Sequence, residues 1–191
     1  MKTTIFLSCM LVAGSFLFNH TKSTNKTSFA SYTVTKSVRS VAPPLPPLKI
    51  IIDKSDYELS VYDSKGWYAT YPVVFGNDPM KDKSMEGDKY TPEGNFKIVT
   101  KKPHDKWSRF LLIDYPNQES LAKFNQRKQR GEIPKTAKPG GGVGIHGTWP
   151  KDDYMIDRYN NWTLGCISLK NADVKEIYGY VPVGTPVTIR K

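Results

Sequence analysis

Short apolar segments, rich in β-branched and aromatic residues and separated by turn sequences, recur along most of this chain. They are too short for most helices and typical of strands. Turn residues such as Ser-Lys-Gly at 64–66 and Thr-Pro-Glu-Gly at 91–94 stand between them. The pattern predicts a mainly β domain over residues 48–191 that opens with an antiparallel meander. The expected strands are residues 48–52, 58–62, 67–75, 95–100, 109–113 and 186–189.

Two helices are expected among these strands. The first follows Asn117, a good capping residue, and ends near Gly131, with an acid in its first turn and basic residues in its last. The second is expected over residues 171–178. The first helix is mostly polar, which favours a solvated surface connector; a lid over a cleft is the alternative.

The N-terminal part of the chain predicts export. Lys2 precedes an almost wholly apolar stretch over residues 5–18, which is shorter than the roughly 20 residues of a membrane span. Residues 1–18 are therefore expected to be a signal peptide or an N-terminal anchor, and the protein to lie in the periplasm or cell envelope. Residues 19–47, rich in Ser, Thr, Lys and Pro, are expected to link this segment to the folded domain.

The basic charge suits an anionic partner, with solubility alone as the alternative. Half of the formal net charge of +10 falls in residues 1–48, which hold five basic residues and no acid. No helix-turn-helix, zinc-finger or RNA-recognition pattern accompanies it, so we expect no nucleic-acid partner. The glycine run at 139–144 is not followed by the Lys-Ser/Thr of a phosphate-binding loop, which argues against nucleotide binding.

Cysteine usage narrows the chemistry. Cys166 is the one cysteine of the expected domain, since Cys9 lies in the apolar N-terminal stretch. A thiol beside an imidazole can act as a nucleophile: the imidazole removes its proton and later returns it to a departing amine. His146 lies twenty residues earlier, where a strand is expected to end. A buried structural cysteine is the alternative. We expect no metal or cofactor, because one cysteine and two histidines without paired spacing do not make a zinc site.

This segment resembles the catalytic motif of the L,D-transpeptidase family with the ErfK/YkuD-type fold, which is a histidine, a spacer, then Ser/Thr-His-Gly-Cys. Here 16 residues separate His146 from Thr163, and Thr163, Gly165 and Cys166 take the matching positions. Residues 87–94, 145–148 and 171–173 resemble further family segments, so the likeness extends over residues 48–191. It implies a β-sandwich of mixed sheets with short helices.

Two positions depart from the motif. Leu164 stands in place of its second histidine, and Ser168 stands where Arg or Asn is often found. Both residues, with Asn161-Trp162-Thr163, are similar to the YafK-like branch of the family. Some members of that branch hydrolyse the link between peptidoglycan and an attached lipoprotein.

The resemblance implies a set of roles. Cys166 would be the nucleophile and His146 the general base; the carbonyl of Gly147 would orient the imidazole, and the Thr163 hydroxyl would assist. The substrate-binding residues implied are Gly165, Ile167, Ser168, Trp162, Trp149 and Thr148. Large aromatic residues are more often in the core, which is the alternative for the two tryptophans.

The expected substrate is the tetrapeptide stem of peptidoglycan. Cys166 would form a thioester with it and expel D-alanine, and an amine would then take the acyl group to give a 3-3 cross-link or a wall-attached protein. One alternative is transfer to water, by an amidase that releases wall-linked lipoprotein or by an L,D-carboxypeptidase. The other is a non-catalytic wall-binding module.

Overall fold

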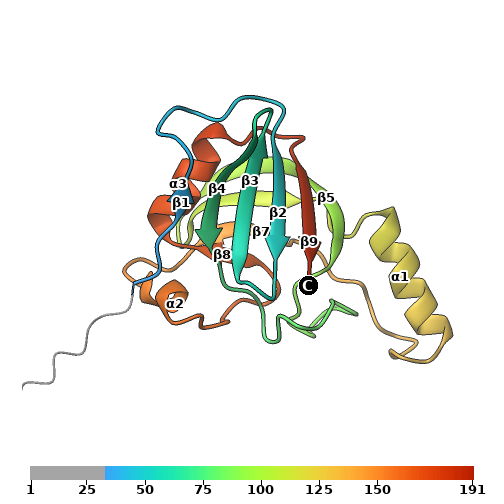
Figure 1. The fold of residues 1–191 in the computed structure, drawn as a ribbon. Coiled ribbons are helices and arrows are strands. Elements are labelled where there is room, and N and C mark those ends of the chain that lie inside the picture. The colour runs from blue at the N-terminus through green and yellow to red at the C-terminus, as the bar shows by residue number, and fades with distance from the viewer. Residues whose placement is uncertain (1–32) are drawn as a thin grey trace, which may run out of the picture. The chain divides into compact units, whose positions relative to one another are not determined.

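A mixed β-sheet forms the body of the protein in the computed structural model, which describes residues 33–191 (Figure 1). Each strand expected from the sequence is present, with bounds displaced by a few residues, so the mainly β fold class is confirmed. In chain order the elements are β1 (Ser37–Val38), β2 (Lys49–Asp53), β3 (Glu58–Asp63), β4 (Gly66–Pro72), β5 (Gly94–His104), β6 (Ser108–Ile113), α1 (Gln118–Gln129), β7 (Gly144–Gly147), α2 (Tyr154–Asp157), β8 (Ile167–Leu169), α3 (Asn171–Tyr180) and β9 (Pro186–Arg190).

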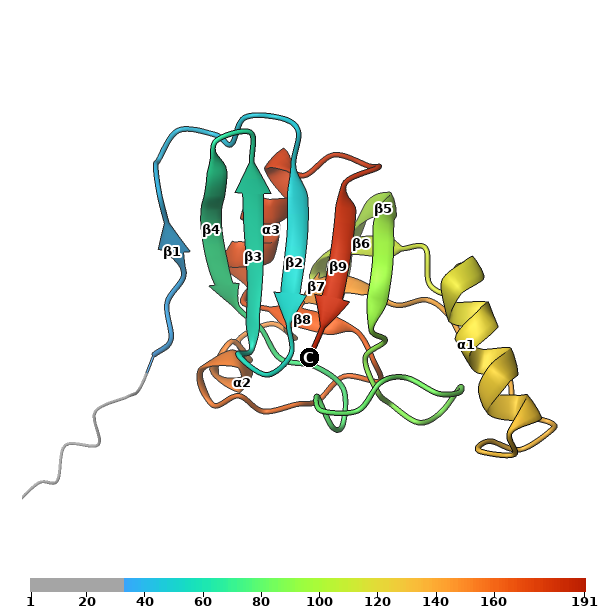
Figure 2. The same cartoon turned by 45° about the vertical axis from the view of Figure 1, so that its right-hand side comes forward.

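The strands follow the order β1-β4-β3-β2-β9-β5-β6-β7-β8 in a nine-stranded sheet of the described residues. β2, β3 and β4 form the expected antiparallel meander, and β9 pairs parallel to β2. The long strand β5 joins the two halves, because residues 94–97 pair with β9 and residues 98–104 pair with β6. A bridge between Val74 and Ser168 ties the chain after β4 to β8. The sheet therefore curves back on itself (Figures 1 and 2).

The core follows from period-two alternation along the strands. Buried residues alternate with more exposed ones in β2, β3 and β9. Ile145 of β7 and Ile167 of β8 belong to the same apolar cluster, which α3 covers with Val174 and Ile177. Each buried isoleucine contributes roughly 1.5–3 kcal/mol. A register slip of one residue in β7 would turn Ile145 out of the apolar core and put the polar His146 into it, so the core specifies the register that the site needs.

Both expected helices are present. Asn117 caps α1 by accepting a hydrogen bond from the Ser120 N–H at 3.0 Å. α1 stands at the edge of the sheet (Figure 2), and Phe124 is its buried residue. Its Arg127 binds the Asp82 carboxylate at 2.7 Å and the Lys83 carbonyl at 2.6 Å. α1 therefore fastens the loop around residues 82–83. The short helix α2 was not expected.

Residues 33–47, here called the N-terminal strap, contact the domain. β1 pairs with β4, and Arg39 binds the buried Asp63 carboxylate, which also accepts the Leu45 N–H. These contacts hold the pKa of Asp63 at about 2, chiefly through the Arg39 hydrogen bond. The described part of the expected linker thus lies against the folded domain. The expected signal or anchor at 1–18 lies outside the described residues, and within 33–191 no helix has the length and apolarity to cross a membrane.

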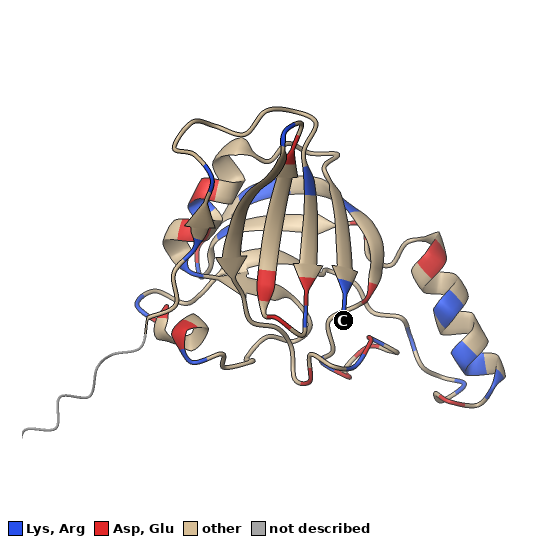
Figure 3. Cartoon of the chain, viewed as in Figure 1, with Lys and Arg blue, Asp and Glu red and all other residues tan. Residues whose placement is uncertain are grey.

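Charged residues lie mainly near strand ends and on the helices, whereas the middle of most strands carries none (Figure 3). This distribution follows from burial, because a lysine or carboxylate in the sheet interior would need a partner to offset its desolvation.

Candidate active site

The pairing of β7 with its two neighbours places the predicted catalytic residues. His146 lies opposite Phe110 of antiparallel β6 and opposite Ser168 of parallel β8. Ile145 pairs with Ile167, and both side chains face the core. Because side chains alternate along a strand, Cys166, one residue before Ile167, falls on the same face as His146. Alternation extended by one residue before β8 thus puts the Cys166 side chain on the His146 side of the sheet.

His146 is buried and held as a neutral base. Its Nδ1 lies 2.7 Å from the Gly147 carbonyl oxygen. A carbonyl can only accept, so Nδ1 carries the proton and Nε2 is left as the basic nitrogen. Burial lowers the pKa of His146 to about 4, against the opposing effect of the Gly147 hydrogen bond. The imidazole is therefore uncharged at neutral pH and free to accept a proton.

Aromatic rings enclose this imidazole. Trp107 stacks on it, with centroids 4.5 Å apart and planes at 23°, and Phe110 lies nearly parallel at 5.9 Å. Trp162 meets it edge-on at 5.6 Å. His104 in turn stacks on Trp107, with ring centroids 4.3 Å apart. Neither Trp107 nor Phe110 was expected at the site from the sequence. Phe110 can be recognised by its position opposite His146, but that position is known only once the pairing of β6 with β7 is known.

The loop that carries Cys166 is held by Thr163. The Thr163 hydroxyl donates to the Cys166 carbonyl at 2.7 Å and accepts the Gly165 N–H at 3.2 Å. The Thr163 N–H in turn bonds the Phe75 carbonyl at 3.1 Å. In this structure the Thr163 hydroxyl therefore shapes the backbone on both sides of the cysteine.

The Cys166 thiol is partly exposed and its Sγ lies 3.7 Å from the Gly142 carbonyl oxygen. Burial raises the pKa of this thiol, while the hydrogen bond to Gly144 and the charge of Lys83 oppose the rise. The thiol is consequently protonated at rest, and a base must remove its proton before it can attack a carbonyl.

Cys166 opens into a cavity of about 530 Å³. Its walls come from the loop around residues 83–89, the tip of the β5–β6 hairpin, the glycine run before β7, and the cysteine loop. Leu164, the departure from the family motif, stands 74% exposed at the rim. The residues that line the cavity are Lys83, Glu86, Gly87, Lys89, Lys102, His104, Trp107, Phe110, Gly140, Gly141, Gly142, Val143, Leu164, Gly165 and Cys166.

Of the expected substrate-binding residues, Gly165 lines this cavity, and the other five are not among its lining residues. Ile167 and Ser168 are fully buried, the first in the core and the second with its backbone paired to Val74. Thr148 is also buried, and its hydroxyl donates to Asp153 at 2.6 Å. Trp162 packs edge-on to His146, whereas the exposed Trp149 packs edge-on to Trp107 at 6.4 Å.

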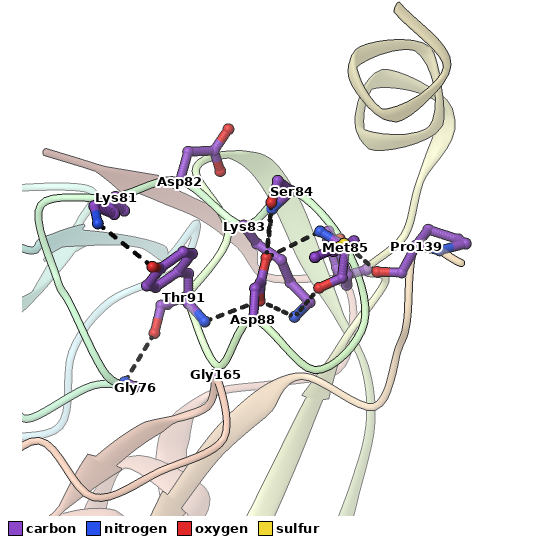
Figure 4. A network of polar contacts seen from close by, with 12 residues as sticks. Gly76, Lys81, Asp82, Lys83, Ser84, Met85, Asp88, Thr91, Pro139 and Gly165 are labelled. Carbon is purple, nitrogen blue, oxygen red and sulfur yellow. Dashed lines mark hydrogen bonds and ion pairs between the residues drawn. The ribbon is translucent and has the colours of Figure 1, made fainter. Parts of the chain in front are cut away.

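The segment at residues 87–94, which resembles a family turn, builds a wall of the cavity. Asp88 is its centre and accepts the N–H groups of Ser84, Met85 and Tyr90 at 2.6–3.0 Å. Figure 4 shows this network with Gly165 beside it. Within residues 33–191 there is no group of three or more His, Cys, Asp or Glu side chains arranged to hold a metal ion.

Comparison with known proteins agrees with this geometry. Residues 47–189 match the family described as the L,D-transpeptidase catalytic domain, YkuD. No curated protein sequence matches the chain. Among solved structures, the helical cell shape determining protein Pgp2 of Campylobacter jejuni is 23% identical, with a TM-score of 0.54 over 75% of this chain and 47% of that one.

Two further structures share the fold. Bd1075 of Bdellovibrio bacteriovorus is 18% identical, with a TM-score of 0.50 over 84% of this chain and 52% of its own. L,D-transpeptidase 3 of Mycobacterium tuberculosis is 14% identical, with a TM-score of 0.52 over 76% and 61%. The chain spans about half the length of Pgp2 and Bd1075. Because the family match covers most of the chain, this protein belongs to the L,D-transpeptidase catalytic domain family.

Proposed function

We propose that this protein is a cysteine-dependent peptidoglycan L,D-transpeptidase that acts on tetrapeptide stems through a Cys166 thioester. Its products would be 3-3 cross-links or proteins attached to the wall. The observation that carries the proposal is the place of Cys166 in the lining of a cavity, one residue before β8, which pairs with the strand that carries the neutral His146.

The chemistry follows from the resting protonation states. The thiol proton passes to Nε2 of His146 as the thiolate attacks the carbonyl of the third stem residue. Backbone N–H groups near Cys166 stabilise the oxyanion. The imidazolium then gives its proton to the amine of the departing D-alanine, leaving the thioester. His146 next deprotonates the acceptor amine, which attacks the thioester and restores the thiol.

The form of the cavity suits a peptide that carries carboxylates. Lys89 and Lys102 line it as exposed cations, and Glu86 is the one acidic side chain among its lining residues. The apolar wall of Trp107 and Phe110 supplies contact area for the stem.

Hydrolysis is the second candidate. The departures from the motif at Leu164 and Ser168 resemble the YafK-like branch, to which we assign the chain as part of this proposal. The side chain of Leu164 is exposed at the rim, so no polar group from this position engages an acceptor. Water would then take the acyl group, as in a carboxypeptidase or in release of a wall-linked lipoprotein. A non-catalytic wall-binding module is the third reading.

The family acts on the cell wall. We propose that residues 1–18 direct this chain to the periplasm or cell envelope, as a cleaved signal or as an anchor. By analogy with Pgp2, which is named for determining helical cell shape, we further propose a role in cell shape.

Mass spectrometry of tetrapeptide muropeptides tests these functions. The purified protein is incubated with them beside a Cys166→Ala variant. A cysteine-dependent dimer that lacks one D-alanine supports transpeptidation, whereas tripeptide alone supports hydrolysis. Products that are unchanged in both samples would refute the tetrapeptide donor, and protein-linked wall would be assayed next.

A further inference from the structure

Lys83 is a buried lysine at the wall of the Cys166 cavity. Its side chain is 5% exposed, and its Nζ donates to Asp88 Oδ1 at 2.8 Å and to the Met85 carbonyl at 3.1 Å (Figure 4). An ammonium group carries three protons. Among residues 33–191 the third has no acceptor, although the side chain lines the cavity.

A second buried lysine shows what a purely structural role requires. Lys54 is fully buried, and its Nζ contacts Glu93 Oε1 at 2.7 Å and the carbonyls of Lys81 and Thr91 at 2.8 and 3.3 Å. All three of its protons are accepted by protein, and it does not line the cavity. Lys83 differs from it in both respects.

The position of Lys83 brings its charge to the cysteine loop. Nζ lies 4.0 Å from the point that a Cβ on Gly165, the neighbour of Cys166, would occupy. Its Cε lies 3.5 Å from the equivalent point on Gly140, on another wall of the cavity. The ammonium is therefore set between two segments that face the reactive sulfur.

The carboxylate that holds Lys83 also serves other donors. Asp88 does not line the cavity, and its carboxylate accepts three backbone N–H groups besides the Lys83 ammonium. The other charged or titratable lining groups are Glu86, Lys89, Lys102 and His104, all more exposed than Lys83. Water and salt screen exposed charges far more than buried ones.

We propose that Lys83, anchored by Asp88, supplies a fixed positive charge that stabilises the thiolate form of Cys166. The inference rests on the proposed function in one respect, the use of Cys166 as a nucleophile. The charge of Lys83 lowers the pKa of the Cys166 thiol, whereas burial raises it, and the proposal agrees with this direction. An opposite charge within about 4–6 Å commonly shifts a pKa by about one unit or more.

The test is the pH dependence of Cys166 alkylation by iodoacetamide, which needs no substrate. The full chain contains Cys9 as well, so alkylation is followed by mass spectrometry of the tryptic peptide 159–170, which holds Cys166. We compare Lys83→Met with Lys83→Arg, which keeps the charge. The double variant Lys83→Met/Asp88→Asn removes the ion pair without leaving a buried charge unpaired. Lys54→Met is the matched control for loss of a buried lysine.

The expected result is an apparent thiol pKa raised by about one unit in both Lys83→Met variants, and close to wild type in Lys83→Arg and Lys54→Met. If the single variant does not fold, the double variant decides. Wild-type profiles in folded Lys83→Met variants would overturn the proposal, as would an equal shift in Lys54→Met. A protein with the expected thiol shifts but no muropeptide turnover would refute the proposed function and support this inference.

Discussion

The indole of Trp107 lies against the imidazole of His146, with ring centroids 4.5 Å apart and planes inclined at 23°. The same residue also holds the backbone of β7, because its carbonyl oxygen accepts the Gly147 N–H at 3.0 Å. One residue of the β5–β6 hairpin thus fixes both the ring of the proposed base and the peptide group beside it.

Replacing Trp107 should change both the position and the pKa of His146. In Trp107→Ala, water reaches the ring, so the pKa rises from about 4 toward its ordinary 6.5. The acidic limb of the kcat/KM profile should move to higher pH by about one unit, and kcat/KM should fall by roughly 10- to 100-fold as the ring loses its orientation. Trp107→Phe keeps a stacked ring and should lose less activity. An unmoved acidic limb in a folded alanine variant would contradict this role.

Stability should depend on pH through the same histidine. Between pH 4 and 6.5 the unfolded chain binds a proton at this site that the folded protein does not. The free energy of unfolding should therefore rise as the pH increases across this window. The added stability should be lost as the pH falls through the same window. The free energy of unfolding of the wild type should differ between pH 7 and pH 4.5. We expect His146→Gln to remove about 2–3 kcal/mol of that difference. Urea unfolding of both proteins at the two pH values measures it, and equal pH dependence would count against a buried neutral imidazole.

Thr163 should contribute through its hydroxyl rather than its size. Thr163→Val keeps the volume but leaves the Gly165 N–H and the Cys166 carbonyl without their partner. The expected loss is about 1–3 kcal/mol of stability, with lower activity because the cysteine backbone is released. Thr163→Ser retains the hydroxyl and should stay close to wild type by thermal unfolding and by the muropeptide assay. A valine variant as active and stable as the serine variant would exclude this role.

Alternation and turn chemistry were sufficient to predict most strands, because burial of one face imposes a local pattern. They were insufficient where pairing is long-range. β9 lies between β2 and β5 in the sheet although it comes last in the chain. β8 is three residues long, too short to carry a period, and β1 is held by pairing with β4 rather than by its own apolar content.

The site divides in the same way. Motif spacing marks Cys166 and His146 as candidates in the sequence, whereas nothing in the sequence distinguishes Lys83 from a solvated lysine. Its burial depends on Asp88, whose carboxylate is itself organised by backbone N–H groups of a loop. In the sequence Trp107 looks like any aromatic residue of the core. Its contact with His146 arises only when the β5–β6 hairpin folds beside β7.

Gly165 is the position where the cysteine loop should be least tolerant of a side chain. Its φ is +125°, and a Cβ there would stand 2.8 Å from the carbonyl oxygen of Tyr90, which lies in the segment at residues 87–94. Gly66 offers a matched control, because its φ is +103° and a Cβ there would meet nothing within 4 Å.

Gly66→Ala should therefore report the backbone strain alone, about 1–2 kcal/mol of stability with activity retained. Gly165→Ala adds a steric contact with backbone, which is relieved only by moving the cysteine loop or the wall that Asp88 organises. We expect a larger loss of stability, and a fall of roughly 100-fold in kcat/KM because Cys166 is displaced from His146. Unfolding free energies and muropeptide turnover of the two variants measure the difference. Equal losses in both variants would mean that the backbone at Tyr90 moves at little cost in free energy. In that case it does not set the position of the nucleophile.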